Sequence, residues 1–402
     1  MTRLLTDWRK QTYGRAVLIA LVLSSVLAPF WPALTSQSDE GLGGDFTAFY
    51  GAGMLANEGD YEVLYTEDAQ LAAQTEGTPM EGGKFLYFSY PPAVAMTYGF
   101  LAAMPYVQAY AIHLGFMFGM LLGAIAIGGT LLPKIKASPE RALLIALGFW
   151  PMRQVIVGGS NTAFTLFVLV VIWRLLESEK DLSAGLVASL LLFKPTFGLP
   201  FLAVLFVSRR WRALGGGAIG GAVYFAVNST LAGVGWVVPW WDQAQRFGEK
   251  DAIINGPAAS SILGFAQNFS KAEWTWYAIV AAGLLVVVWL GTAWIWSRPN
   301  VDLATLMAVF AVASIWGSPH AMSHEIAVLL LPVAVLVQRA KRPVGHWLVV
   351  MDIASWFGLA MIALGWAPSF FMAMVIGGLV LRELPRWMAR SSADATELVS
   401  SA

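Results

Sequence analysis

The sequence has 402 residues, of which 57% are hydrophobic and only 12% are charged. Soluble domains carry about 25% charged residues, and a soluble globule of this length cannot hide so many apolar side chains from water. The composition therefore excludes a soluble enzyme, a disordered chain and a nucleic-acid-binding protein with a basic face, and it predicts a protein with many membrane spans. Basic and acidic residues number 25 each, so the formal net charge is zero, and the lack of cysteine excludes disulfides, thiolate nucleophiles and Cys-ligated metals.

Apolar segments recur along the whole chain at lengths near the roughly 20 residues that a spanning helix needs. They predict an all-α bundle of about 11 or 12 transmembrane helices, some of them short. The segments cover residues 16–34, 106–132, 141–157, 162–176, 182–207, 213–231, 276–296, 303–316, 326–337, 347–365 and 370–381. Lys194-Pro195 interrupts the segment 182–207, which allows two short spans meeting there. We expect residues 1–390 to form one membrane domain and the polar tail 391–402 to be disordered.

The distribution of basic residues predicts the orientation of the chain. Lysine and arginine cluster near the N-terminus, around 134–136, around 209–212, around 339–342 and around 382–390. The positive-inside rule places these segments and the N-terminus in the cytoplasm. Two long stretches then lie outside: residues 35–90, which are acidic, and residues 232–275, which are rich in tryptophan. The apolar segment 91–104 is short for a span, and we expect it to lie as a helix in the outer membrane interface.

Asp45 is conspicuous because it follows the first apolar segment and stands at the start of another, in Gly43-Gly44-Asp45-Phe46-Thr47-Ala48-Phe49-Tyr50. An aspartate before an apolar helical run is a common helix N-cap. The aromatic surroundings also suit a carboxylate at the membrane–water boundary, where its proton affinity can be tuned.

Further polar residues stand out against the apolar background. Tyr90 precedes Pro91-Pro92, where a helix start and an interfacial anchor are the simple interpretations. Asn161 ends the turn that begins at Gly158-Gly159, and such a turn needs no function. Arg153 lies shortly before this turn, where its side chain could either reach a lipid phosphate or bind a phosphorylated ligand. Lys194 lies inside an apolar stretch, where it either forms a structural ion pair or serves a function.

His320 and His324 lie four residues apart in Ser318-Pro319-His320-Ala321-Met322-Ser323-His324-Glu325. Such a pair on a helix shares one face and could bind zinc, but Pro319 breaks the helix and the sequence has no HExxH order. An ordinary outer loop and a histidine that contacts a phosphate or an acceptor hydroxyl are the other interpretations. The glycine run at 215–221 indicates close helix packing rather than a phosphate-binding loop, because no Lys-Ser/Thr follows it.

Several of these motifs occur in an order that resembles glycosyltransferase family 87, a member of the C-type glycosyltransferase superfamily. They are Asp-Phe-x-x-Phe-Tyr-x-Ala-Gly from Asp45 with Leu64-Tyr65, then Tyr90-Pro91-Pro92, the turn ending in Asn161, Lys194-Pro195 with the basic run at 209–212, and Ser318-Pro319-His320. The family includes polyprenyl-phosphate-mannose-dependent mannosyltransferases. The sequence departs from the common pattern at Gly159-Ser160-Asn161, where Gly-Gln and then Asn is usual, and at Glu325, where Asp is frequent.

The resemblance implies inverting transfer of a hexose, with mannose expected, from a polyprenyl-phosphate donor to a lipid or glycan acceptor on the outer face of the plasma (inner) membrane. By the same resemblance, Asp45 is the general base and His320 lies near the donor phosphate. Lys194, Arg153 and His324 are expected to bind that phosphate, and Tyr50, Tyr90, Asn161 and Glu325 to line the substrate pocket. No Asp-x-Asp pair occurs in the first outer stretch, so we expect neither a metal nor another cofactor.

Two other functions remain open on the sequence alone. A transporter or flippase of lipid-linked sugars would explain the many spans and Lys194, although such carriers tend to show paired broken helices and only one break is visible. A polysaccharide ligase or polymerase also acts on lipid-linked sugars at the outer face. The predicted partners are the donor, the acceptor and membrane lipids, and nucleic acid is not among them.

Overall fold

The computed structural model of the chain describes residues 7–27, 42–79, 85–254, 259–270, 275–340 and 368–401. Within these residues the regular structure is helical, and the β-type pairing is a single isolated bridge between Ala259 and Met322. The prediction of an all-α membrane protein is therefore confirmed.

Most of the described helices follow the apolar segments of the sequence, with breaks where proline or glycine intervenes, whereas the helices Glu67–Gly77 and Val237–Ile254 lie in more polar stretches. The first half contains α1 (Asp7–Leu27), α3 (Phe46–Glu58), α4 (Glu67–Gly77), α5 (Pro92–Ala102), α6 (Tyr106–Leu131), α7 (Pro133–Ala137), α8 (Pro139–Gly148), α9 (Trp150–Val157), α10 (Thr162–Glu177), α11 (Asp181–Ala188) and η3 (Ser189–Phe193). The second half contains α12 (Pro195–Val207), α13 (Trp211–Ala232), α14 (Val237–Ile254), α15 (Ile262–Ser270), α16 (Trp276–Trp296), α17 (Leu303–Trp316), η5 (Ser323–Leu329), α18 (Leu330–Arg339) and α20 (Pro368–Ser401).

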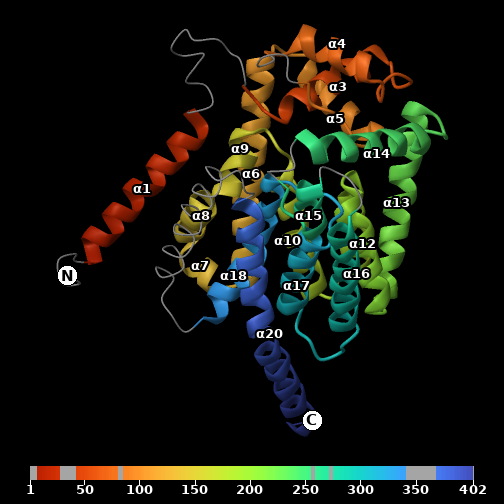
Figure 1. The fold of residues 1–402 in the computed structure, drawn as a ribbon. Helices are drawn as coiled ribbons and strands as arrows, with labels where there is room; N and C mark the ends of the chain where they lie inside the picture. Colours follow the sequence, from red (N-terminus) through yellow and green to blue (C-terminus); the bar gives the residue numbers. More distant parts are fainter. Residues whose placement is uncertain are drawn as a thin grey trace.

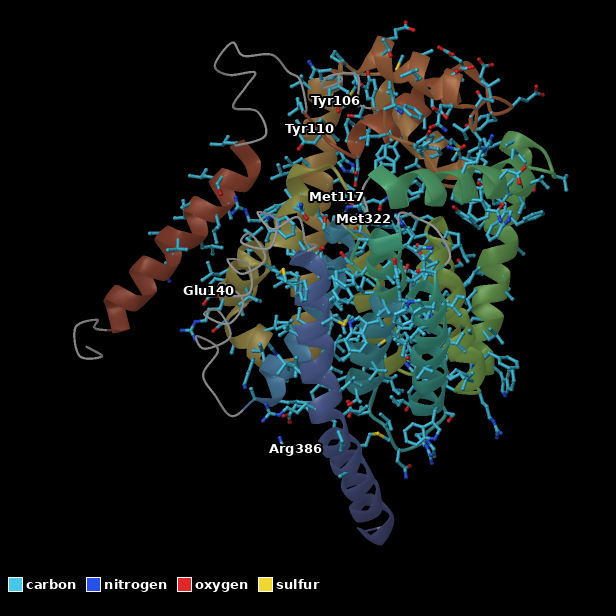
Figure 2. All side chains as sticks on the ribbon, in the orientation of Figure 1. Tyr106, Tyr110, Met117, Glu140, Met322 and Arg386 are labelled. Carbon is cyan, nitrogen blue, oxygen red and sulfur yellow. The ribbon has the colours of Figure 1, made fainter. Side chains whose placement is uncertain are left out.

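The helices form a long bundle with a helical layer at one end (Figure 1). Helices α3, α4 and α5 make up this layer, in which α3 packs against both α4 and α5. Helix α14 lies across the bundle beside the layer, whereas α12, α13, α16, α17 and α20 run away from it (Figure 1). Tyr106 and Tyr110 lie at the layered end and Arg386 lies toward the opposite end (Figure 2).

Two described helices are long and apolar enough to cross a membrane, α6 and α16. Two bent pairs, α9 with α10 and α13 with α14, bring the number to four if each pair counts as one span. The sequence predicted more spans because it counted apolar segments that the structure breaks into shorter helices, such as α5, α12 and α17. Large apolar side chains on α16, including Val287 at 62% and Leu290 at 65% exposure, are suited to lipid rather than to water.

The structure corrects one expectation about helix boundaries. The predicted span 141–157 is two helices, α8 and α9, because Pro151 lacks the N–H that would continue the first. The stretches 35–90 and 232–275, which we expect to lie outside the membrane, contain α3 and α4 and then α14 and α15. The predicted break at Lys194-Pro195 is confirmed, since η3 ends at Phe193 and α12 begins at Pro195.

Three further predictions concern single segments. Helix α5 has 11 residues and is therefore about 16 Å long, half the roughly 30 Å of a bilayer core, and the interfacial position of segment 91–104 stays a prediction. Helix α20 continues to Ser401, through the tail expected to be disordered. The predicted span 347–365 lies outside the described residues.

The glycine run at 215–221 packs as predicted. Helix α13 lies against α11 so closely that a Cβ at Gly216 would collide with the carbonyl oxygen of Leu182. In the opposite direction, a Cβ at Gly185 of α11 would collide with the carbonyl oxygen of Ala213. Small residues on both helices thus allow their backbones to touch.

Candidate active site

Asp45 occupies the N-cap position of α3, but its side chain makes no capping hydrogen bond. Its backbone N–H instead donates to the carbonyl oxygen of Gly158, at 2.8 Å, in the turn between α9 and α10. The carboxylate of Asp45 is 41% exposed. The N-cap interpretation therefore describes where Asp45 stands on the chain, while its carboxylate is left available for other contacts.

Two glycine pairs fix the backbone around Asp45. Gly44 and Gly159 both have positive φ angles, +46° and +67°, which L-residues with a side chain adopt only with strain. A Cβ at Gly44 would lie 2.7 Å from the carbonyl oxygen of Gly158, and a Cβ at Gly159 would collide with the carbonyl oxygen of Gly43. The turns 43–44 and 158–159 therefore interlock, and Asp45 is held against the turn between α9 and α10.

The aromatic residue after Asp45 anchors the start of α3 in the core. The side chain of Phe46 is fully buried, with its ring centroid 5.4 Å from that of Tyr106 and 5.0 Å from that of His113. The hydroxyl of Tyr106 in turn donates to the carbonyl oxygen of Leu42 at 2.7 Å. Residues on both sides of Asp45 are thus tied to α6.

His324 is the nearest charged partner of Asp45. Its Nδ1 lies 3.6 Å from Oδ2 of Asp45, and its side chain is 21% exposed. This distance is longer than a hydrogen bond but short enough for electrostatic attraction when the imidazole is protonated. The contact joins η5 to the start of α3, two segments that are far apart along the chain.

A buried ion pair lies beside this contact. Nζ of Lys194 is 3.2 Å from Oε1 of Glu325, with side-chain exposures of 5% and 10%. Lys194 also donates to Oγ1 of Thr162 at 3.4 Å, and Oε2 of Glu325 accepts the backbone N–H of Met322 at 3.2 Å. An ammonium group has three donors, so one N–H of Lys194 remains after these two contacts.

The charges around Glu325 determine its protonation. Burial alone would raise the pKa of its carboxyl, but Lys194 and the nearby His324 and His320 outweigh that effect and hold the pKa below its usual value. Glu325 is therefore ionised at neutral pH and neutralises Lys194. His324 and His320 thus both lie close enough to the carboxylate of Glu325 to act on it electrostatically.

Tyr90 approaches the group from the layered end of the bundle. Burial, followed by the carboxylates of Asp45 and Glu325, raises the pKa of its hydroxyl well above the usual value, and a hydrogen bond with the side chain of Asn161 partly offsets the increase. Asn161 is itself 4% exposed, and its Oδ1 is buried without a hydrogen-bond partner. An unpaired buried acceptor is unfavourable, so Oδ1 of Asn161 is available for a donor group from a ligand.

Helix α14 packs over the same residues, which the sequence did not indicate. Nε1 of Trp240 donates to the carbonyl oxygen of Ser89 at 3.0 Å, next to Tyr90. The ring of Phe247 meets that of His320 edge-on, with centroids 5.3 Å apart. The aromatic residues at 236, 240, 241 and 247 were the available signal, but their partners lie too far away in the sequence to be identified from it.

Two predicted site residues are not joined to this group by the contacts described. Tyr50 is 6% exposed in the core, and its hydroxyl donates to the carbonyl oxygen of Met104 at 2.8 Å, so it supports the packing of α3 instead. Arg153 lies on α9, which packs against η5, and its Nε is buried without a hydrogen-bond partner. The described part of the chain contains no group of three or more His, Asp or Glu side chains placed to hold a metal.

Comparison with known protein families gives one result. The model of glycosyltransferase family 87 matches residues 88–319, more than half of the sequence. The chain belongs to glycosyltransferase family 87. No curated protein and no solved structure gave a significant match. The protein is accordingly a membrane glycosyltransferase, as the composition and the helices also indicate. The family 87 match includes Tyr90, Asn161 and Lys194, whereas Asp45 precedes it and His320 follows directly after its end.

Proposed function

We propose that this family 87 enzyme transfers a hexose, with mannose expected, from a polyprenyl-phosphate donor to a hydroxyl of a lipid or glycan acceptor. The transfer inverts the configuration at the sugar C1, and Asp45 is the general base. The proposal places the enzyme in the plasma (inner) membrane with the N-terminus in the cytoplasm. The end of the bundle that carries α3, α4 and α5 then faces the periplasm or the extracellular space.

The observation that carries this proposal is the assembly of five ionisable side chains from three distant parts of the chain. Asp45 contacts His324, the adjacent Glu325 pairs with Lys194, and His320 lies within electrostatic range of Glu325. Ionisable groups within an apolar helical protein are energetically expensive and mark functional sites by default. Their gathering at one place supports a catalytic role better than separate structural roles would.

The chemistry requires a base on one side of the sugar and positive charge on the other. Asp45 accepts the proton of the acceptor hydroxyl while the acceptor oxygen forms a bond to C1. The bond between C1 and the phosphate oxygen breaks, and the polyprenyl phosphate leaves with the electron pair. The growing negative charge on that phosphate is stabilised by the remaining N–H of Lys194, by Arg153 and by a protonated His320.

The exposures of the two carboxylates support Asp45 rather than Glu325 as the base. Asp45 is 41% exposed and accepts no capping bond, so a substrate hydroxyl can reach it. Glu325 is buried, with its two oxygens engaged by Lys194 and the N–H of Met322. Tyr90 lies within electrostatic range of both carboxylates and is hydrogen-bonded to the side chain of Asn161, so the two residues supply a hydroxyl and an amide for hydrogen bonds to the sugar.

A donor and acceptor screen with the purified full-length protein tests the proposal. Radiolabelled polyprenyl-phosphate mannose, other polyprenyl-phosphate hexoses and pyrophosphate-linked oligosaccharides are each supplied with phosphatidylinositol and oligosaccharide acceptors. We expect transfer only from monophosphate donors, and a product whose anomeric configuration is opposite to that of the donor. Use of the pyrophosphate donor alone would instead identify a ligase or polymerase, and donor-independent flux in liposomes would identify a carrier.

Asp45→Asn tests the assignment of the base. We expect transfer to fall by at least a hundredfold, in the range typical of a lost general base, with unchanged thermal stability in detergent. Asp60→Asn is the matched control, because Asp60 is an exposed aspartate just past the end of the same helix. Activity of Asp45→Asn equal to that of Asp60→Asn would refute the role of Asp45.

A further inference from the structure

A cavity lies in the bundle away from the candidate active site. It is an open pocket rather than a closed void, with about 850 Å³ of space between its lining residues, part of which is continuous with the surroundings of the protein. Helices α6, α7, α8, α10 and α18 contribute its walls. None of Asp45, Lys194, His320 or His324 lines it.

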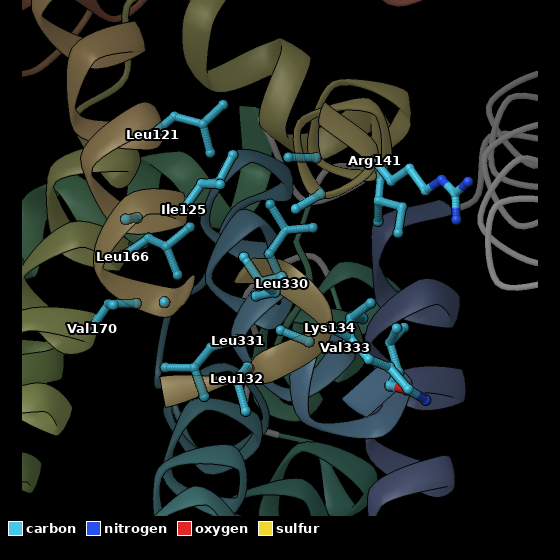
Figure 3. A pocket seen from close by; sticks show the side chains of 18 of the residues that line it. Leu121, Ile125, Leu132, Lys134, Arg141, Leu166, Val170, Leu330, Leu331 and Val333 are labelled. Carbon is cyan, nitrogen blue, oxygen red and sulfur yellow. The ribbon is translucent and has the colours of Figure 1, made fainter. Parts of the chain in front are cut away.

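The walls of the cavity are almost entirely apolar. Leu121, Ala124, Ile125, Gly128 and Leu132 recur at helical spacing along one face of α6 and its end. Leu166 and Val170 of α10 and Leu331 of α18 are further wall residues. In Figure 3 the side chains of Leu121, Ile125 and Leu166 lie on one side of the cavity and Arg141 lies on the other. Apolar walls of this kind fit a hydrocarbon chain.

The length of the apolar wall matches one leaflet of a membrane. Eleven residues separate 121 from 132, which corresponds to about 16 Å at the rise of an α-helix. Half of the hydrocarbon core of a bilayer is about 15 Å thick. A single acyl chain extended from the interface to the bilayer centre would therefore run the length of this wall.

The charged residues of the cavity all belong to one short segment, residues 133–141. Lys134 and Arg141 line the cavity, Lys136 lies between them in sequence, and Glu140 is the one acidic residue of the segment. Nζ of Lys134 already donates to the carbonyl oxygens of Val337 and Ala340, which leaves it one N–H. Arg141 is exposed and makes no hydrogen bond or ion pair with another described residue. A cation at the rim of an apolar cavity, without an acidic partner in the described part of the chain, is complementary to an anionic lipid headgroup.

We propose that this cavity binds one acyl chain of an anionic glycerophospholipid, whose phosphate lies against Arg141 and Lys134. The N-terminus of α8, where Ser138 also lines the cavity, adds a favourable dipole for the phosphate. The site is separate from that of the polyprenyl donor, because the residues proposed to hold the donor phosphate are not among those that line it. The lipid acts as a bound structural ligand of the basic end of the bundle, and its binding requires no transfer activity.

Native mass spectrometry of the full-length protein released from dodecyl maltoside micelles tests this proposal. The probe is phosphatidylglycerol, titrated in parallel with phosphatidylcholine of the same chain length. We expect one phosphatidylglycerol to bind per chain in preference to phosphatidylcholine. Arg141→Gln should weaken phosphatidylglycerol binding about fivefold, equivalent to the roughly 1 kcal/mol that one basic residue contributes near an anionic lipid. Arg212→Gln, which removes an exposed arginine outside the cavity, should leave binding unchanged.

Filling the cavity tests the position of the acyl chain. A Cβ at Gly128 meets only Ile135 Cδ1, at 3.6 Å, so Gly128→Leu fits the helix and directs its side chain toward the cavity. We expect this variant to lose the bound lipid, and Ala334→Leu on the opposite wall is a second variant should the first not fold. Equal binding of both phospholipids, unchanged binding in Arg141→Gln or in the filled variants, or one-for-one displacement by polyprenyl phosphate would each overturn the proposal.

Discussion

The buried pair of Lys194 and Glu325 gives the sharpest test of how the site is held together. Lys194→Met removes the ammonium group and leaves the carboxylate of Glu325 without its partner at 10% exposure. At 3.2 Å and an effective dielectric constant of about 20, the attraction between the two charges is about 5 kcal/mol. Removal of one partner from a buried pair is known to cost about 3–5 kcal/mol. We therefore expect Lys194→Met to lower the free energy of unfolding by that amount.

The double variant Lys194→Met/Glu325→Leu tests how much of this loss arises from leaving one buried charge unpaired rather than from losing the ion pair itself. Replacement of both charges by apolar groups of similar volume is often neutral or stabilising. We expect the double variant to unfold within about 1 kcal/mol of the wild type, so the two single losses are far from additive. Unfolding in mixed dodecyl maltoside and SDS micelles, followed by tryptophan fluorescence, measures the stability of the wild type, of the single variants Lys194→Met and Glu325→Leu, and of the double variant.

The pH dependence of the same measurement provides an independent check. The pKa of Glu325 is lower in the folded protein than its unfolded value of about 4.5, so its contribution to stability is fully present above that pH and disappears as the pH falls through the folded pKa. The wild type should therefore lose stability below about pH 4.5 more steeply than Glu325→Gln. The assigned ion pair would be refuted if the stability losses of the two single variants simply added up in the double variant. It would also be refuted if the wild type and Glu325→Gln lost stability equally below about pH 4.5.

The remaining predictions concern backbone contacts and buried hydrogen bonds. Gly159→Ala should destabilise the protein by about 1–2 kcal/mol, as measured by unfolding, because position 159 has a positive φ. It should also lower activity in a transfer assay, because the collision of the new Cβ with Gly43 displaces Asp45. Gly185→Ala should cost about 1–3 kcal/mol of stability because the added Cβ separates α11 from α13. Gly215→Ala adds a Cβ with no atom within 4 Å, so it should be neutral or stabilise the protein by up to about 1 kcal/mol. The melting temperatures of the two variants test this difference. Asn228→Ala should cost about 1–3 kcal/mol because it leaves the buried N–H of Ala93 without an acceptor, and a stability equal to the wild type would contradict that hydrogen bond.

The features that the sequence predicted correctly are those set by local chemistry. Pro195 ends η3 and begins α12, and Pro92 stands at the start of α5, because proline lacks the amide hydrogen in both places. The glycine run of α13 indicated close packing because only glycine lets two helix backbones touch. The break within 141–157 had the same kind of signal in Pro151, which the apolar composition of the segment concealed.

The features that the sequence did not provide depend on contacts between distant segments. Lys194 was expected either to pair or to function, but its partner Glu325 is 131 residues away and no periodicity connects the two. The two Gly-Gly turns were visible separately, yet their interlocking requires the positions of α3 and α9 in space. Helix α4 lies in an acidic stretch with little apolar periodicity, where Gln70 and Gln74 bind the carbonyl oxygens of Phe88 and Leu86. Those bonds stabilise it by tertiary contact rather than by local propensity.

The two carboxylates of the candidate site illustrate how environment assigns a role to a residue type. Glu325 has both oxygens occupied and its pKa lowered by Lys194 and two histidines, so it binds a proton weakly and cannot reach a substrate. Asp45 has one oxygen near His324 and a large exposed fraction, so its other oxygen can face an acceptor hydroxyl. A protonated His324 between the two would be attracted by both, and this would keep Asp45 oriented while Glu325 stays with Lys194. Under the proposed mechanism the buried pair therefore positions the histidine, the histidine positions the aspartate, and only the aspartate exchanges a proton with the substrate.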